Sequence, residues 1–250
     1  MKLTGNTIFI TGGGSGIGRG LAEALHKLGN EVIISGRRMN VLAEVTMANP
    51  GMKSVEMDVT DPASITAVAK KLIAEHPKLN VLINNAGIMT PDAVQGDVDD
   101  DIVTPMVTTN LLGPIRLTSA LIGHLKQQPA AAIINVTSGL AFIPLAITAT
   151  YSATKAALHS YSLSQRYLLK DTNVRVLELA PPYVQTELMG PQQLSDPNAM
   201  PLDEFIAETM KVLGTDADEV LTQRVAFLRD ATGRGDSSFT TKFNDMFSGH

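Results

Sequence analysis

Three residues in the second half of the chain, Ser138, Tyr151 and Lys155, have side chains that together could exchange a proton with a carbonyl compound. Tyr151 and Lys155 are four residues apart, so on a helix their side chains share one face. A phenol with a pKa of about 10 is a poor acid or base at neutral pH, but a neighbouring ammonium group favours the phenolate. The Ser138 hydroxyl could donate to the carbonyl oxygen, which gains negative charge as hydride arrives. We therefore expect Lys155 to tune Tyr151, although a Tyr and a Lys at this spacing are by themselves more often surface residues.

A glycine-rich turn near the N-terminus could hold the phosphates of a dinucleotide. It runs from Thr11 to Gly18 and joins an apolar stretch to an amphipathic one. Gly12, Gly16 and Gly18 allow positive φ and remove the Cβ atoms that would keep a pyrophosphate from the start of the next helix. The spacing differs from the general G-x-G-x-x-G fingerprint, so an ordinary glycine-rich turn is the alternative. The residues expected to bind the cofactor here are Gly12, Gly14, Ser15, Gly16, Ile17 and Gly18.

Three other strand ends carry residues that suit the remainder of a dinucleotide. Asp58 could accept a hydrogen bond from an adenine amino group, or it could simply stabilise a turn. The small polar turn of residues 84–87 suits a backbone that passes close to a ribose, although Asn-rich turns are common. After the second strand, Gly36 precedes Arg37 and Arg38, where an NAD-specific enzyme usually has an acidic residue. The two guanidinium groups therefore favour a 2′-phosphate and NADP, unless both are solvated residues at a helix start.

These residues are separated by short apolar stretches that alternate with longer helical patterns. The predicted strands are Thr7–Thr11, Glu31–Ser35, Lys53–Met57, Val81–Asn84, Ala131–Thr137 and Val174–Leu179. This alternation indicates βαβ units, and so a Rossmann-type, doubly wound parallel sheet in a single α/β domain over residues 1–250. The pattern after the glycine turn predicts a helix over 17–28, and Asp61 with Pro62 marks another helix start. The proline-rich stretch 181–201 is expected to be a functional loop within a substrate-binding region of about 182–215.

Taken together, the motifs resemble the short-chain dehydrogenase/reductase family from about residue 4 to 190. The resemblance implies that Tyr151 is the general acid in reduction, that Ser138 polarises the carbonyl, and that Lys155 holds the nicotinamide ribose. It also implies that Asn110 supports a water relay to Lys155, and that Val184 and Thr186 hold the carboxamide. Within the family, residues 137–146 and 229–232 look like a bacterial subgroup of DltE-type oxidoreductases. The further cofactor contacts expected on this basis are Asp58, Val59, Asn85, Ala86, Gly87 and Pro181.

The sequence departs from the family pattern in two places. Pro182 stands where the family commonly has Gly, which stiffens the entrance to the substrate loop. The C-terminal stretch around residues 231–238 does not read as the usual final strand. We therefore expect a homodimer or homotetramer, with the tetramer in doubt.

Composition narrows the function classes. The chain has no Cys, which excludes disulfides and thiolate metal sites and fits a cytoplasmic protein. Its net charge is −5 and its basic residues are scattered, so no nucleic-acid partner is expected. The five His residues lie far apart without ligand spacing, and no metal is predicted. A membrane span is not expected either, because no long uncharged apolar run is present.

The segments around the expected catalytic residues suggest the substrate class. They are largely apolar, and they lack the Lys or Arg cluster that would hold a phosphate or carboxylate. We therefore expect NADP(H)-dependent interconversion of an apolar ketone and its secondary alcohol. The alternatives are an NAD(H)-dependent form and a non-catalytic dinucleotide-sensing module, whereas a sugar epimerase would need a larger substrate domain. The expected substrate contacts are Ser138, Leu140, Tyr183, Leu188 and Met189.

Overall fold

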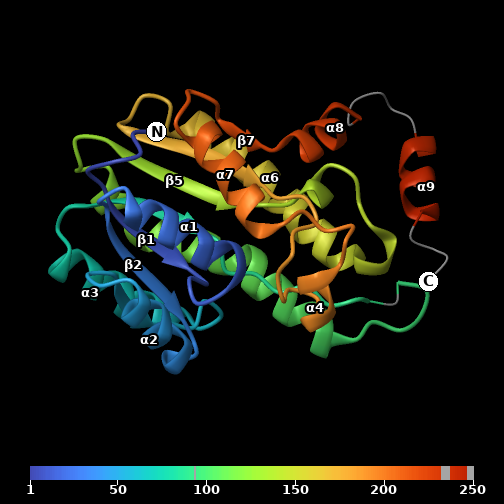
Figure 1. Cartoon of the computed structure of the whole chain (residues 1–250), viewed down its shortest axis with the longest axis horizontal. Coiled ribbons are helices and arrows are strands. Elements are labelled where there is room, and N and C mark those ends of the chain that lie inside the picture. The colour runs from blue at the N-terminus through green and yellow to red at the C-terminus, as the bar shows by residue number, and fades with distance from the viewer. Residues whose placement is uncertain (93, 232–236, 247–250) are drawn as a thin grey trace.

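The alternating apolar stretches form one parallel sheet in the computed structural model, which describes residues 1–92, 94–231 and 237–246 (Figure 1). Its strands are β1 (Thr7–Thr11), β2 (Glu31–Gly36), β3 (Lys53–Glu56), β4 (Leu79–Asn84), β5 (Ala131–Val136), β6 (Val174–Ala180) and β7 (Glu219–Leu221). Their order is β3-β2-β1-β4-β5-β6-β7, and every neighbouring pair is parallel. The chain winds outward in one direction from β1 and then in the other from β4. The carboxyl ends of β1 and β4 therefore form the switch point where such sheets bind ligands.

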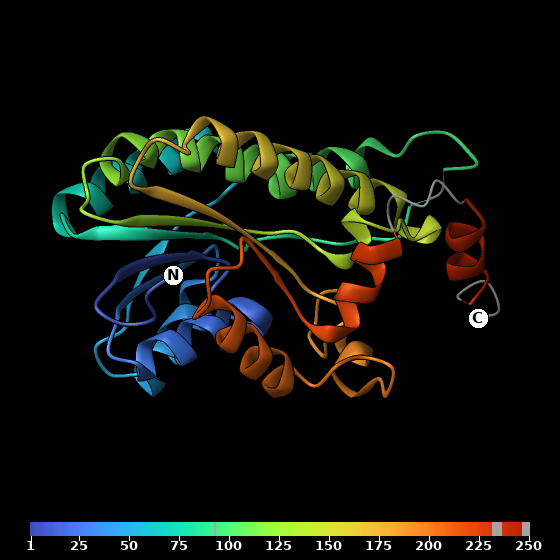
Figure 2. The same ribbon diagram turned by 90° about the horizontal axis from the view of Figure 1, so that it is seen from above.

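Helices cover both faces of the sheet and bury its alternate residues. They are α1 (Gly16–Lys27), α2 (Met39–Ala48), α3 (Pro62–Glu75), α4 (Asp100–Val107), α5 (Gly113–Leu125), α6 (Ala149–Leu168), α7 (Leu202–Leu213), α8 (Gln223–Ala231) and α9 (Ser237–Asp245). Ile8 and Ile10 of β1 pack with side chains of α1, α2 and α7, whereas Phe9 between them packs with α3 and α5. Figure 2 shows these layers edge-on, with the sheet between α5 and α6 on one side and α1 and α7 on the other. The predicted doubly wound single domain is confirmed.

The final strand of the sheet contradicts one expectation. The sequence predicts six strands and no final strand near 231–238, yet β7 pairs with β6 over residues 219–221. Of the three residues of β7, only Val220 is buried. A strand this short has no alternating apolar pattern that could be recognised in the sequence. β7 is stabilised by its pairing with β6 rather than by a pattern in its own residues. Residues 232–236 of the predicted departure lie outside the described residues.

One helix start and one helix interruption follow from local residue chemistry. The Asp61 carboxylate accepts hydrogen bonds from the backbone of Ala63 and Ser64, and Pro62 occupies the first turn of α3, as predicted. A π-helical turn, η1 (Thr108–Leu112), interrupts the helical stretch between α4 and α5. Prolines at 105 and 114 lack the N–H groups that a continuous α-helix needs, which explains the break. Over the described residues, none of the helices combines the length and apolar character needed to cross a bilayer.

Candidate functional site

The glycine turn between β1 and α1 has the geometry that its sequence predicts. Gly12 has φ +67° and Gly16 has φ +51°, values that favour glycine. A Cβ on Gly18 would lie 2.3 Å from the main-chain oxygen of Gly12, so the first turn of α1 packs directly against the loop. A Cβ on Gly14 would lie 3.0 Å from the Val41 side chain. The turn therefore brings bare backbone to the carboxyl end of β1.

The start of α1 suits an anionic group. Its first turn contains no acidic residue, and Ser15 is the N-cap. Within the part of the chain that the structure describes, the Ser15 side chain makes no capping hydrogen bond, which leaves N–H groups of the first turn available. These N–H groups and the helix dipole stabilise a phosphate at such a position. Ile17, the next predicted contact, instead packs against the core beneath the turn.

Hydrogen bonds join the ends of β1 and β4 at the switch point. The Thr11 hydroxyl accepts from the backbone N–H groups of Asn85, at 3.0 Å, and Ala86, at 2.9 Å. In return, the Asn85 amide donates to the main-chain oxygen of Thr11 at 2.9 Å. The predicted turn after β4 is thus fixed against the glycine turn. A Cβ on Gly87 would lie 3.6 Å from Lys155 Nζ, so this same turn reaches the expected catalytic Lys.

The residues expected at the adenosine end lie at the carboxyl ends of β2 and β3. Arg37 and Arg38 are exposed, and neither has an ion-pair partner among residues 1–92, 94–231 and 237–246. Asp58 Oδ1 accepts hydrogen bonds from the backbone and hydroxyl of Thr60, so the turn role weighed as the alternative is present. Burial opposes ionisation of Asp58, but the bonds from Thr60 and the charge of Arg37 outweigh it and lower its pKa. The main-chain oxygen of Val59 lies 2.9 Å from where a Cβ on Gly113 would be, so Val59 packs on the start of α5.

The loop after β6 lies against the glycine turn. Thr186 is buried, and its side chain would lie 3.3 Å from a Cβ on Gly16. Val184 is also buried and forms an isolated parallel bridge with Met200. Gln193 was not predicted as a site residue, yet its amide donates to the Val184 main-chain oxygen and to the Thr186 hydroxyl. The sequence signal was weak, a single amide side chain in a loop with several polar residues.

Ser138, Tyr151 and Lys155 are all buried at the carboxyl end of β5 and the start of α6. Backbone bonds from Thr137 to Leu179 and from Gly139 to Pro181, both 2.8 Å, extend the β5–β6 pairing on either side of Ser138. Lys155 Nζ lies 5.6 Å from the centre of the Tyr151 ring. The three predicted residues are therefore brought together by β5, β6 and α6.

Burial governs the pKa values of this pair. It raises the pKa of Tyr151 to about 12, and the Ser138 side chain opposes this only in part. Burial also lowers the pKa of Lys155 to about 8. Burial therefore acts against the expected lowering of the phenol pKa by Lys155, which stays a prediction. Tyr151 is a neutral phenol, the state from which a proton can be donated.

Asn110 lies in the π-helical turn η1 and is completely buried. Its side-chain oxygen accepts from the Ile88 backbone N–H, and its amide donates to the Ile88 carbonyl and to the Thr154 hydroxyl. Pro114 has no N–H, so it cannot donate to the main-chain oxygen of Asn110 as the fourth residue of an α-helix would. This leaves the Asn110 carbonyl suited to the predicted water relay, which stays a prediction.

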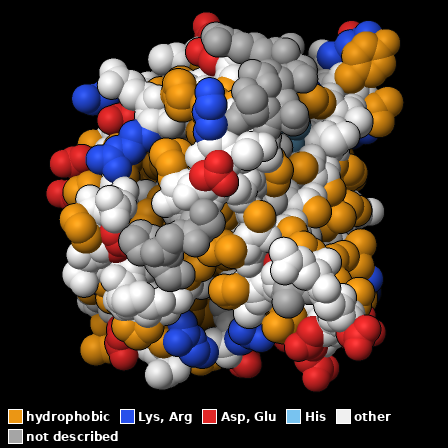
Figure 3. Space-filling model, turned by 90° about the vertical axis from the view of Figure 1, so that its right-hand side faces the viewer, with side chains coloured by type: hydrophobic (Ala, Val, Ile, Leu, Met, Phe, Trp, Pro, Cys, Tyr) orange, Lys and Arg blue, Asp and Glu red, His pale blue; other side chains and the backbone are white. Residues whose placement is uncertain are grey.

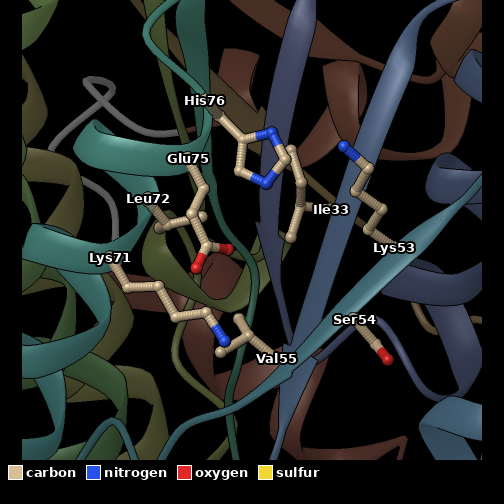
Figure 4. Close-up of a pocket in the computed structure, with 8 residues that line it drawn as sticks. All are labelled: Ile33, Lys53, Ser54, Val55, Lys71, Leu72, Glu75 and His76. Carbon is tan, nitrogen blue, oxygen red and sulfur yellow. The ribbon is translucent and has the colours of Figure 1, made fainter.

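Two hollows differ in their relation to these residues. One, of about 270 Å³, lies between β3 and α3 and contains Lys53, Lys71, Glu75 and His76 (Figure 4). It lies at the β3 edge of the sheet, whereas the expected catalytic residues follow β5. Lys53 and His76 both bind Glu31. The second, of about 390 Å³, lies beside the segment after Ser138. Its lining is Val94, Leu140, Ala141, Pro144, Leu145, Ala146, Ala149, Ser152, Ala153, Ala156, Thr240 and Asn244.

The predicted substrate contacts are not all brought to the second hollow. Leu140 lines it, but Tyr183, Leu188 and Met189 belong to the loop after β6 and do not. Tyr183 is exposed and its hydroxyl donates to Asp196 in the same loop, at 3.0 Å. Figure 3 shows the end of the molecule that carries α9, where hydrophobic side chains gather on the surface. Exposed hydrophobic residues of this half of the chain include Ile147, Phe227 and Met246.

A sequence model of the short chain dehydrogenase family matches residues 6–196 of the chain. The chain belongs to this family. It is an oxidoreductase of the NAD(P)-dependent dehydrogenase and reductase class. The match spans the glycine turn, the Asn-rich turn and the expected catalytic residues, and the predicted family is confirmed.

Two curated members of the family are similar over most of their length. "Uncharacterized oxidoreductase DltE" of Bacillus subtilis is 42% identical over 238 residues, which cover 93% of this chain and 94% of that protein. The predicted likeness to DltE-type oxidoreductases is thereby confirmed. An "NADP-dependent 3-hydroxy acid dehydrogenase" of Schizosaccharomyces pombe is 32% identical over 226 residues, 84% of this chain and 86% of that protein.

Solved structures share the fold of this short chain dehydrogenase. One from Burkholderia cenocepacia, in complex with NADP, has a TM-score of 0.84 and 27% identity, covering 97% of this chain and 98% of that one. Another from Burkholderia phymatum, in complex with NAD, has a TM-score of 0.83 at 20% identity, covering 92% and 93%. The second similarity shows the fold alone.

Proposed function

We propose that this short chain dehydrogenase is an NADP(H)-dependent carbonyl reductase that acts on apolar ketones, with Tyr151 as the general acid. The observation that carries the proposal is the joint burial of Ser138, Tyr151 and Lys155, with Lys155 Nζ 5.6 Å from the centre of the Tyr151 ring. When bound, the nicotinamide supplies the hydride for reduction and accepts it for oxidation. The protein supplies the proton and a buried site for the reaction.

Each side chain has a role that its position supports. Tyr151, which keeps its proton up to a pKa of about 12, donates it to the carbonyl oxygen. The Ser138 hydroxyl donates a hydrogen bond to the same oxygen as negative charge develops there. Lys155, with a pKa of about 8, is largely an ammonium group at neutral pH and holds the ribose hydroxyls next to Tyr151. Burial of all three excludes water from the reacting atoms.

The residues of the cofactor half fit a dinucleotide. Glycines at 12, 16 and 18 form a cradle that side chains would fill, and the start of α1 offers N–H groups to a pyrophosphate. Asn85, Ala86 and Gly87 would lie along the ribose, and the loop residues Pro181, Val184 and Thr186 along the carboxamide.

NADP is the proposed cofactor and NAD the alternative. Arg37 and Arg38 are exposed guanidinium groups at the carboxyl end of β2, suited to a 2′-phosphate. The Schizosaccharomyces pombe relative is named as NADP-dependent, and the Burkholderia cenocepacia structure contains NADP. Both similarities support the proposal.

The substrate is proposed to be an apolar ketone. Leu140 and Leu145, in the segment after Ser138, line an apolar hollow of about 390 Å³, and Leu188 and Met189 lie in the loop after β6. A 3-oxo acid is the competing substrate, because one relative is named as a 3-hydroxy acid dehydrogenase. Residues 182–210 contain neither Lys nor Arg to bind its carboxylate. This composition favours the uncharged ketone.

The test compares kcat/KM of NADPH-dependent reduction for an aryl methyl ketone, a short 3-oxo acid, a keto-sugar and an acyl-thioester ketone. We expect the aryl methyl ketone to be preferred by about tenfold or more, since one apolar contact contributes about 1 to 3 kcal/mol. Preference for the keto-sugar or the 3-oxo acid by the same margin would overturn the substrate class. Tight NADPH binding without turnover of any carbonyl compound would support a dinucleotide-sensing module. Cytoplasmic location and homo-oligomerisation also stay predictions.

A further inference from the structure

A completely buried carboxylate lies directly behind the segment that carries Ser138. Glu178 of β6 is 0% exposed, and its Oε1 accepts a hydrogen bond of 2.7 Å from the Thr137 hydroxyl. Its Oε2 lies 2.7 Å from His159 Nδ1. Thr137 precedes Ser138 in the chain, and His159 lies one helical turn beyond Lys155 on α6. A single side chain thus joins the strand end that carries Ser138 to the helix that carries Tyr151.

The three residues of α6 involved are spaced to face the same way. Tyr151, Lys155 and His159 follow each other at intervals of four, so their side chains form one row along the helix. Lys155 Nζ donates to the main-chain oxygen of Val136, at 2.8 Å. This bond and the His159–Glu178–Thr137 chain tie the helix to the end of β5 at two successive turns. Both ties lie within two residues of Ser138 on the strand side.

The same cluster fixes the segment that follows Ser138. The Phe142 ring contacts the His159 ring edge-to-face with 5.3 Å between centroids, and the Arg229 guanidinium lies 5.2 Å from the Phe142 centroid. Arg229 also donates two hydrogen bonds to Glu219, of 2.9 and 3.1 Å. The Glu178 carboxyl group thus lies against the His159 ring of α6, which in turn packs on Phe142 beside Arg229 of α8. The cluster therefore holds Phe142, four residues after Ser138, in the core beside Val225 of α8.

A metal site is the other interpretation of these groups. The ligand atoms of His159, Glu178 and Glu219 all lie within 4.8 Å of one another. However, Glu219 already binds Arg229 through both oxygens, and Glu178 is satisfied by Thr137 and His159. The guanidinium supplies the positive charge that a metal would bring. The contacts therefore favour a structural tie.

We propose that Glu178 is a positioning residue that acts through Thr137 and His159 to set the Ser138 hydroxyl against Tyr151. This inference rests on the proposed role of those two residues in carbonyl reduction. Reacting groups displaced by about 1 Å can lose about 100-fold in rate, so loosening this tie lowers kcat. Most of the cofactor affinity is expected to be retained, because the glycine turn belongs to β1 and α1.

The decisive variants are Thr137→Val and Glu178→Leu, each measured for ketone reduction and for NADPH affinity by fluorescence. We expect kcat to fall by about tenfold or more in each, with the Kd for NADPH within about twofold of the wild type. The double variant is expected to be no slower than Glu178→Leu alone, because both changes break one interaction. Glu178→Gln keeps an acceptor for Thr137 and can donate to His159, so it is expected to stay within about threefold of the wild-type kcat.

Thr222→Val is the matched control. The Thr222 hydroxyl is buried and has no hydrogen-bond partner among the described residues, so its replacement tests the same change of shape without a lost bond. We expect its kcat to be unchanged. Thr137→Val removes one hydroxyl only, so it can test the positioning role even if Glu178→Leu does not fold.

Three results would contradict the positioning role. One is a wild-type kcat in both Thr137→Val and Glu178→Leu, and another is a loss of NADPH affinity as large as the loss of kcat. The third is a rise of Tm with added Zn²⁺ that Glu178→Gln abolishes, which would identify a metal site. A wild type that reduces no ketone overturns the proposed function and this role with it, whereas the three results above overturn the positioning role alone.

Discussion

Lys155 Nζ lies 5.6 Å from the centre of the Tyr151 ring and donates a 2.8 Å hydrogen bond to the main-chain oxygen of Val136. Both side chains are buried, and burial favours the uncharged form of each. A neutral phenol is the form that the proposed role of Tyr151 as proton donor requires.

Replacing Tyr151 with Phe removes the proton donor and keeps the ring. We expect kcat of ketone reduction to fall by at least about 100-fold, because general acid catalysis contributes about 10² to 10⁴. The Kd for NADPH, measured by fluorescence, is expected to change little. A variant that keeps more than about a tenth of the wild-type rate would exclude Tyr151 as the acid.

Replacing Lys155 with Met is expected to stabilise the protein at neutral pH while it removes activity. A drop in the Lys155 pKa from 10.5 to about 8 costs roughly 3 kcal/mol, part of which is offset by the lost bond to Val136, so the net gain is roughly 1 to 2 kcal/mol. The wild type bears this cost fully below pH 8. Between pH 8 and 10.5 the unfolded state binds more protons than the folded state, so wild-type stability rises.

The advantage of the Met variant is therefore expected to shrink as pH rises from 8 towards 10.5. Urea unfolding of both proteins across this range measures it. A difference in unfolding free energy that stays constant with pH would show that burial does not lower the Lys155 pKa.

Changing Gly36 to Asp is expected to shift the cofactor preference from NADPH to NADH. A Cβ at this position would lie 3.7 Å from its nearest neighbour, Leu42, so a side chain fits. The new carboxylate repels the 2′-phosphate and can bind the ribose hydroxyls, so the ratio of kcat/KM values should fall by about tenfold or more. Gly36→Ala is the uncharged control and should keep the wild-type ratio. A wild type that already prefers NADH tenfold would show that Arg37 and Arg38 are only solvated.

Adding one methyl group at Gly18 is expected to abolish NADPH binding. Its Cβ would lie 2.3 Å from the main-chain oxygen of Gly12, which must shift and distort the turn. Gly123 of α5 is the control, because its Cβ would meet nothing within 4 Å. We expect Gly123→Ala to bind NADPH normally and to be about 0.5 to 1 kcal/mol more stable. Calorimetric titration checks the binding; equal affinities of the two variants would refute a tight cradle.

The oligomeric state is expected to be a dimer or tetramer built on α6. Leu163 and Tyr167 are four residues apart on this helix and are 41% and 67% exposed. Apolar side chains in such a row suit pairing across a twofold axis. Leu163→Glu is expected to yield monomers by light scattering at micromolar concentration, whereas Met47→Glu on α2, at a residue 81% exposed, is not. A monomeric wild type would contradict the prediction.

The sequence by itself predicted the first six strands in their order along the chain and most residues of the candidate site. The glycine turn, the Asn-rich turn and the Tyr151–Lys155 spacing are local features, because the side chains and backbone angles involved belong to a few consecutive residues. Asp61 with Pro62 set the start of α3 for the same reason. Local features of this kind can be recognised in a sequence without knowledge of the fold.

The tertiary structure decided what depends on residues far apart in the chain. β7 exists because β6 pairs with it, since three residues have no pattern of their own. The raised pKa of Tyr151 and the lowered pKa of Lys155 follow from burial, which spacing along a helix does not reveal. Glu178 is separated by 41 residues from Thr137 and by 19 from His159, and only the packing of β6 against β5 and α6 brings them into contact.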